Sequence, residues 1–171
     1  MKAVNLLINS VLPEDLHDDA RVYDKKGVGK LMASIAAAYP DRYNELSKFL
    51  SDTGRKASYI QGETLTLKDM KPPFDKAPYL AKMDKELAMM EGTTKNTYER
   101  TRKRMEIYAK YNDMFQDLTM KHSKGRNLMN IVASGARGNP GQMKMMVTTP
   151  GLFSDYKDEP VDLFVRNSYG E

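Results

Sequence analysis

Two amphipathic stretches separated by a short turn constrain the fold of this chain more than any other feature. In both stretches apolar side chains recur at three- and four-residue steps, which is the period of a helix with one apolar face. Gly92-Thr93-Thr94, between them, is typical of a helix end followed by capping residues. Helices joined by so short a turn bury their apolar faces by lying antiparallel. We therefore predict an antiparallel coiled-coil hairpin whose second arm is about two to three turns longer than the first. The predicted seam consists of Leu80, Met83, Leu87 and Met90 in the first arm and Tyr98, Met105, Tyr108, Phe115 and Leu118 in the second.

The rest of the chain is predicted to be mainly helical, with short extended pieces. A helix opens at Gly27-Val28-Gly29 and ends before Pro40, and Asp41 caps the next helix. Residues 64–66 and 160–165 are predicted to be extended, and 142–147 to form a short helix. The fold class is thus mainly α, in one elongated and continuous module. Its predicted parts are a helical base at residues 1–73, the hairpin at 74–125, and a glycine-rich loop with an extended C-terminal segment at 126–171.

Composition excludes several functional classes. With 40% hydrophobic and 29% charged residues, the 171-residue chain is predicted to be soluble and globular. It has no cysteine, and therefore no disulfide and no thiolate metal site. No apolar run is long enough to span a membrane, and no signal-peptide pattern opens the chain, so a cytoplasmic location is expected. Four carboxylates surround His17, but a run of acids at a turn usually stays solvated, so we predict no metal site there. These carboxylates belong to Glu14, Asp15, Asp18 and Asp19.

The stretch Ser134–Asn139 reads SGARGN and follows the apolar run 128–133. Glycine adopts backbone conformations closed to other residues and allows a ligand to approach closely. Arg137, between two such positions, offers a planar and permanently charged fork, which suits phosphate. By itself this spacing suggests a phosphate-binding loop; a surface arginine paired with a nearby carboxylate would show the same pattern.

The complete string closely resembles the loop that precedes the bridge helix in the largest catalytic subunit (β′) of multisubunit RNA polymerases. The similarity is collinear from about Leu12 to Glu171, and the hairpin resembles the one at the rim of the family's secondary channel. Further matching positions are Thr53-Gly54, Gly62-Glu63-Thr64-Leu65, Asp69-Met70, Glu99-Arg100, Ile107-Tyr108, Asn112-Asp113, Gln142-Met143-Lys144, Gly151-Leu152 and residues 165–171.

The resemblance implies that Arg137 approaches the triphosphate of the incoming nucleotide in an assembled polymerase. Gln142 and Lys144 match family positions nearby and are predicted to bind substrate with it. Lys144 stands where the family commonly has arginine, and Pro150 stands where an arginine commonly precedes the Gly-Leu pair. The implied partners are other polymerase subunits or fragments, with nucleotide and nucleic acid bound only in the assembled complex. Magnesium is expected in that complex, with no cofactor or metal ligand in this chain.

The family's catalytic aspartate motif, Asn-Ala-Asp-Phe-Asp-Gly-Asp, does not occur in the sequence, and neither do the bridge helix and trigger loop. We therefore expect no catalytic residue and no polymerisation by this chain alone. Two hypotheses follow: part of a β′-like subunit, for example a split phage-encoded version, or a stand-alone module that binds proteins or has a structural role, even in a virion. Met1 favours a natural start, and retention of Arg137 and Gln142 favours the first hypothesis. The expected location is then the cytoplasm of a host cell, or the virion.

Overall fold

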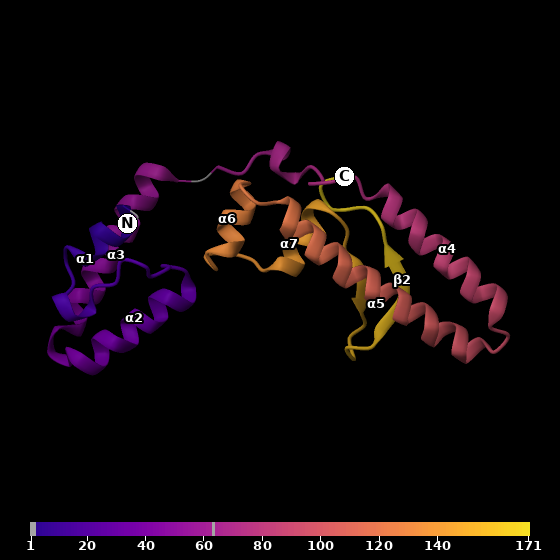
Figure 1. The fold of residues 1–171 in the computed structure, drawn as a ribbon, viewed down its shortest axis with the longest axis horizontal. Coiled ribbons are helices and arrows are strands. Elements are labelled where there is room, and N and C mark those ends of the chain that lie inside the picture. Colours follow the sequence, from indigo (N-terminus) through magenta and orange to yellow (C-terminus); the bar gives the residue numbers. More distant parts are fainter. Residues whose placement is uncertain (1–2, 63) are drawn as a thin grey trace. The chain divides into compact units, whose positions relative to one another are not determined.

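The computed structural model describes residues 3–62 and 64–171, which form two compact units (Figure 1). The N-terminal unit comprises Met1–Thr64 with Ala133–Ala136, and the hairpin unit comprises Leu65–Val132 with Arg137–Glu171. Within the described residues there are seven α-helices and one two-stranded antiparallel sheet. The mainly α class is therefore confirmed, whereas the three-part division at residues 73 and 125 stays a prediction.

Three helices build the N-terminal unit: α1 (Ala3–Asn9), α2 (Lys25–Ala38) and α3 (Tyr43–Gln61). Helix α2 begins two residues before the predicted Gly27, because the Asp24 carboxylate accepts a hydrogen bond from the Gly27 backbone N–H at 2.6 Å. Asp41 does not cap α3, so that prediction is wrong: Asp41 lies in a 3₁₀ turn at Pro40–Arg42. The core of this unit is small and consists of Leu12, Leu31, Ile35 and Leu46.

The loop between α1 and α2 is held by a buried amide. The Asn5 side chain donates to the backbone carbonyl oxygens of Asp18, Asp19 and Arg21 at 3.1, 2.9 and 3.1 Å. The acids near His17 bind protein groups instead of converging on one point: Asp15 accepts from the Tyr39 hydroxyl at 2.6 Å, and Asp19 accepts from Asn9. No group of three or more potential metal ligands occurs in the part of the chain that the structure describes.

Helices α4 (Ala77–Thr93) and α5 (Thr97–His122) form the predicted antiparallel hairpin (Figure 1). Its direction is evident from two ion pairs: Glu86 contacts Lys110 at 2.9 Å, and Glu91 contacts Arg104 at 3.2 Å. The helices have 17 and 26 residues, so α5 is longer by about 2.5 turns, as predicted. No described helix is long and apolar enough to cross a membrane.

The apolar cluster of the hairpin lacks four of the nine predicted seam residues, Met90, Tyr98, Met105 and Leu118. Met83 of α4 packs with Tyr111 and Phe115 of α5, and Phe164 from the sheet joins them. Tyr98 lies in the first turn of α5, next to the end of α4 at Thr93, and is 79% exposed. Met105 is half-buried. Tyr98 was therefore wrongly assigned to the seam, whereas Met90, Met105 and Leu118 are buried or half-buried but lie outside this cluster. Since the sheet contributes to the same cluster, the helices share their apolar faces with a third element, and the coiled-coil class stays a prediction.

Basic residues tie the turn of the hairpin together. The Arg100 guanidinium donates to the carbonyl oxygens of Glu91, at 3.2 Å, and of Thr94. Lys103 donates to the Thr94 hydroxyl at 3.2 Å, and Thr94 is buried although its neighbours are exposed. Carbonyl oxygens at a helix C-terminus lack partners within the helix, and cations there are stabilising. The basic start of α5 thus caps the end of α4.

The remaining elements of the hairpin unit pack beside α5. They are α6 (Asn127–Ala133), α7 (Pro140–Val147), β1 (Gly151–Ser154) and β2 (Pro160–Val165). The helix predicted at 142–147 and the extended segment at 160–165 are confirmed. The strand predicted at 64–66 is wrong: Thr66 instead precedes a 3₁₀ helix at Leu67–Met70, and its N–H and hydroxyl both donate to the Asp69 carboxylate. Leu128, Val132, Met143 and Val147 form the core between α6 and α7.

Alkaline pH should weaken the hairpin through Tyr111. Burial, together with the hydrogen bond to Glu86, raises the pKa of Tyr111 to about 12. Because the folded-state pKa lies above the usual value near 10, the contribution is present below pH 10 and is lost as the pH rises toward 12. We expect the free energy of unfolding to fall over this range, and to fall less steeply in Tyr111→Phe. Urea unfolding of both proteins at pH 9, 10 and 11 measures this, and parallel pH profiles would contradict it.

Candidate phosphate-binding loop

The SGARGN loop is shaped by its two glycines. Gly135 and Gly138 have φ angles of +72° and +78°, in the left-handed region that favours glycine. Gly135 is constrained further within the N-terminal unit, where a Cβ atom would lie 2.9 Å from the Lys25 Cβ. Both glycines therefore adopt a backbone conformation that is closed to most other residues, as predicted from the sequence.

The loop ends in a helix cap that the sequence analysis missed. The Asn139 side chain accepts a hydrogen bond from the Gln142 backbone N–H at 2.8 Å, and Pro140 occupies the first turn of α7. An asparagine followed by proline is a sequence signal for such a start, because proline needs no N–H partner there. The cap fixes the position at which the loop passes into α7.

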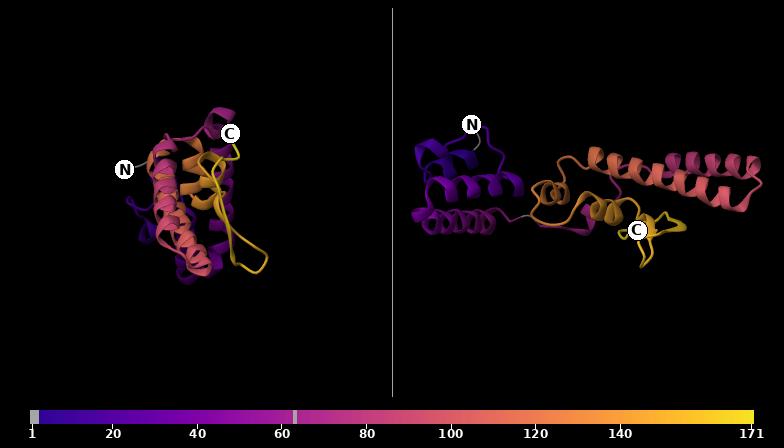
Figure 2. Two further views of the ribbon diagram at one scale, coloured as in Figure 1. Left: turned by 90° about the vertical axis from the view of Figure 1, so that its right-hand side faces the viewer. Right: turned by 90° about the horizontal axis from the view of Figure 1, so that it is seen from below.

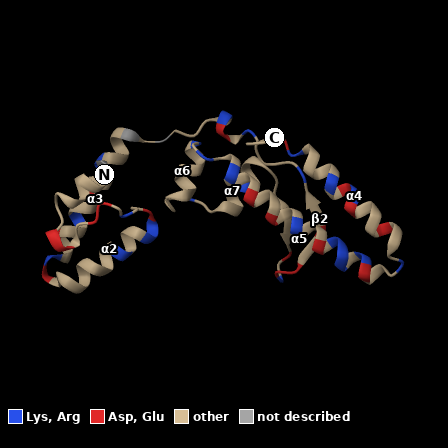
Figure 3. Ribbon diagram, viewed as in Figure 1, with Lys and Arg blue, Asp and Glu red and all other residues tan. Residues whose placement is uncertain are grey.

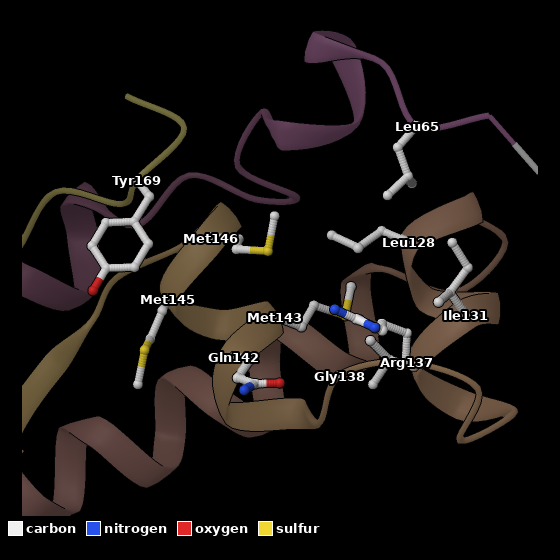
Figure 4. Close-up of a pocket in the computed structure, with 11 residues that line it drawn as sticks. Leu65, Leu128, Ile131, Arg137, Gly138, Gln142, Met143, Met145, Met146 and Tyr169 are labelled. Carbon is white, nitrogen blue, oxygen red and sulfur yellow. The ribbon is translucent and has the colours of Figure 1, made fainter. Parts of the chain in front are cut away.

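Arg137 lies at the edge of a hollow of about 530 Å³ within the hairpin unit (Figure 4). Its side chain is exposed, and among the residues that the structure describes no carboxylate forms an ion pair with it. Figure 4 shows Arg137 and Tyr169 at opposite ends of the hollow, with Gln142 on the first turn of α7. The other lining residues are mostly apolar: Leu65, Leu128, Ile131, Val132, Gly138, Met143, Met145 and Met146.

Lys144, the third predicted substrate residue, is placed differently. Its side chain does not line the hollow; the residue is 3% exposed, and its ammonium group donates to the Asn112 Oδ1 atom on α5. Burial lowers the pKa of Lys144, because the charged form loses hydration. The structure therefore brings Arg137 and Gln142 to one hollow and Lys144 to the interior. The sequence analysis had matched Asn112 to the family but had not connected it with Lys144.

Buried polar groups hold the C-terminal end of α7 against α5 and the sheet. The Thr119 and Thr148 hydroxyl oxygens lie 2.7 Å apart, and the Thr149 hydroxyl accepts from the Gly151 N–H at 3.1 Å while donating to the Val165 carbonyl. Lys76, before α4, donates to the Thr148 carbonyl at 2.9 Å. Hydrogen-bonded buried groups of this kind favour one defined packing. The loop is thus followed by a helix that is anchored at both ends.

These features define a helical module that presents, on a glycine-flanked loop, an arginine without an ion pair among the described residues, a class of site suited to anions. No family model matches the chain. It is 30% identical over 159 residues to the DNA-directed RNA polymerase subunit beta' of Thermotoga neapolitana, a match that covers 86% of this chain. It is 26% identical to the subunit beta' of Fusobacterium nucleatum over 97% of the chain, and 26% identical to the subunit beta'' of Rhodomonas salina over 88%.

The chain corresponds to a segment of a β′ subunit of DNA-directed RNA polymerase. The resemblance predicted from the sequence is thereby confirmed, since relatives with this description match most of the chain. The chain spans only 9 to 13% of the length of these relatives.

Proposed function

We propose that the chain works inside a multisubunit DNA-directed RNA polymerase as part of a β′-like subunit. The α4–α5 hairpin would contribute to the rim of the secondary channel, and the SGARGN loop would lie close to the incoming nucleotide. The single observation that carries this proposal is the exposed guanidinium of Arg137 at the hollow, on a loop of matching sequence. A stand-alone binding or virion module is less favoured, because the relatives are named as polymerase subunits.

Arg137 is the residue we assign to the nucleotide's triphosphate. A guanidinium donates two parallel hydrogen bonds to phosphate oxygens and keeps its charge at all relevant pH values. The exposed Gln142 side chain, in the first turn of α7, can donate to an oxygen of the same ligand. Lys144 acts indirectly in this proposal: its bond to Asn112 connects α7 with α5 and so positions the first turn of α7.

Magnesium, which such polymerases use for phosphoryl transfer, does not fit this chain. The aspartate motif is absent from the sequence, and the described residues contain no group of three or more potential ligands. The ions would be held by other parts of the assembled enzyme. The proposed partners are accordingly the remaining polymerase subunits or fragments, and the β′-like subunit that we propose is a split, phage-encoded one.

Reconstitution tests the proposal. The other polymerase subunits encoded in the same genome are purified with and without this chain, and template-directed RNA synthesis is measured. We expect no RNA from the isolated chain, RNA from the complete complex, and a loss of synthesis when the chain alone is omitted. Synthesis by the isolated chain, or full synthesis without it, would contradict the proposal. The control is the chain with Arg55→Ala, which removes an exposed arginine far from the loop in sequence and should support RNA synthesis at the parental level.

A further inference from the structure

The outer part of the β1–β2 hairpin is an exposed element that carries apolar side chains. In the left view of Figure 2, its turn projects away from the helices. Residues 156–163 are all exposed, including Tyr156 at 90% and Leu163 at 58%. Monomeric proteins seldom leave several large apolar side chains uncovered on one projecting element, and two-stranded hairpins are marginally stable alone.

The two faces of the hairpin differ in their contacts. Leu152 pairs with Phe164, and Phe164 is buried against α5, so these residues face the unit. Successive side chains of a strand point to opposite faces. Phe153 and Leu163, the neighbours of this inward pair, are both exposed, and the register of the two strands is interrupted between Leu152 and Ser154. Val161, also exposed, adds to the apolar surface beside them.

The hairpin is acidic in a chain that is otherwise basic. Residues 151–165 carry four carboxylates and one lysine, whereas the whole chain has a net charge of +4. Figure 3 shows acidic residues at the turn between the strands. Asp162 pairs with Arg104 at 2.8 Å, and Asp155 accepts the Lys157 and Glu159 N–H groups within the turn. Asp158 and Glu159 have no ion pair with any described residue, so both carboxylates are available to a partner.

We propose that the outer face of this hairpin docks a protein segment with an apolar centre flanked by lysine or arginine. Phe153 and Leu163 would pack against the apolar centre, and Asp158 and Glu159 would pair with the basic flank. The carboxylates of the hairpin attract a basic partner and repel phosphate, so nucleic acid is a poor occupant. The inference concerns a surface remote from Arg137 in sequence and does not depend on a role in nucleotide binding.

Two synthetic amphipathic helical peptides probe the surface in the full chain. One has leucines on one face and lysines on the other, and its partner has glutamates in place of the lysines. By fluorescence anisotropy we expect the lysine peptide to bind about tenfold more tightly or better. The double substitution Phe153→Ser/Leu163→Ser should weaken its binding by about tenfold, and Asp158→Lys/Glu159→Lys should reverse the preference between the peptides. Leu67→Ser, which alters a leucine that is 89% exposed outside the hairpin, should have no effect.

Several outcomes would overturn the proposal. Equal affinity for the two peptides would remove the charge argument, and an equal loss with Leu67→Ser would show unspecific binding. A mixed-sequence RNA oligonucleotide whose binding requires Leu163 would identify nucleic acid as the occupant instead. A dimer in sedimentation analysis that disappears with Leu163→Ser would identify a second copy of this chain. Circular dichroism of each variant establishes that the fold is retained.

Discussion

Replacement of Arg137 by alanine is expected to lower kcat/KM for nucleotide addition by the reconstituted polymerase about 30- to 1000-fold. This range corresponds to the roughly 2–4 kcal/mol that a charged donor contributes to a phosphate ligand when water is excluded. The fold should be unaffected, because the side chain is exposed and has no ion-pair partner among the described residues. The measurement is single-nucleotide extension of a preformed RNA–DNA scaffold at varied nucleotide concentration.

Arg137→Lys separates the charge of the side chain from its shape. Lysine keeps the charge but cannot donate two parallel hydrogen bonds, so we expect only part of the rate to return. The matched control is Arg55→Ala, which removes an arginine that is also exposed but lies on α3. If Arg137→Ala extends RNA at the parental rate in an intact complex, the substrate role is wrong. If it prevents assembly, the loop is an interface between subunits.

Phe115→Ala should destabilise the hairpin unit by about 3–5 kcal/mol, the usual cost of emptying a large buried aromatic position. Phe115 has no exposed surface, and its ring contacts those of Phe74, Tyr79 and Phe164 at centroid distances of 6.4, 6.3 and 6.2 Å. These rings come from the segment before α4, from α4 itself and from β2. A single substitution would therefore loosen the contacts among the helices and the sheet at once. Urea unfolding followed by circular dichroism measures the loss.

Tyr98→Ala is the control on the same helix. Tyr98 is also an aromatic residue of α5, but it is exposed, so its removal should change the free energy of unfolding by less than about 0.5 kcal/mol. Similar losses for the two substitutions would mean that Phe115 does not occupy the centre of the core. Because the two units have separate cores, the unfolding curves are fitted with two transitions, and the loss is expected in the transition of the hairpin unit.

The α4–α5 hairpin could be predicted from the sequence only in part. Its arms, direction and difference in length were predictable, because helical periodicity and a short turn act locally along the chain. Its exact contacts were not: Tyr111 and Ile107 pack in the cluster, while Tyr98 does not. A helix with apolar side chains on more than one face can bury any of them, and the choice depends on where α4 ends and where β2 lies. Neither position is encoded within α5.

The candidate site divides in the same way. The two loop glycines, the arginine between them and the β′ relationship could be predicted from the sequence, since they depend on local backbone preference and on residue order. The packing of the helices could not be predicted, and it places Arg137 and Gln142 at one hollow while Lys144 points into the interior toward Asn112. The physical reason is that charge and spacing describe what a side chain can bind, whereas burial depends on the packing of distant elements around it. Gln142 and Lys144, two residues apart on α7, point to different sides of the helix, and the packing of α7 against α5 buries the side that carries Lys144.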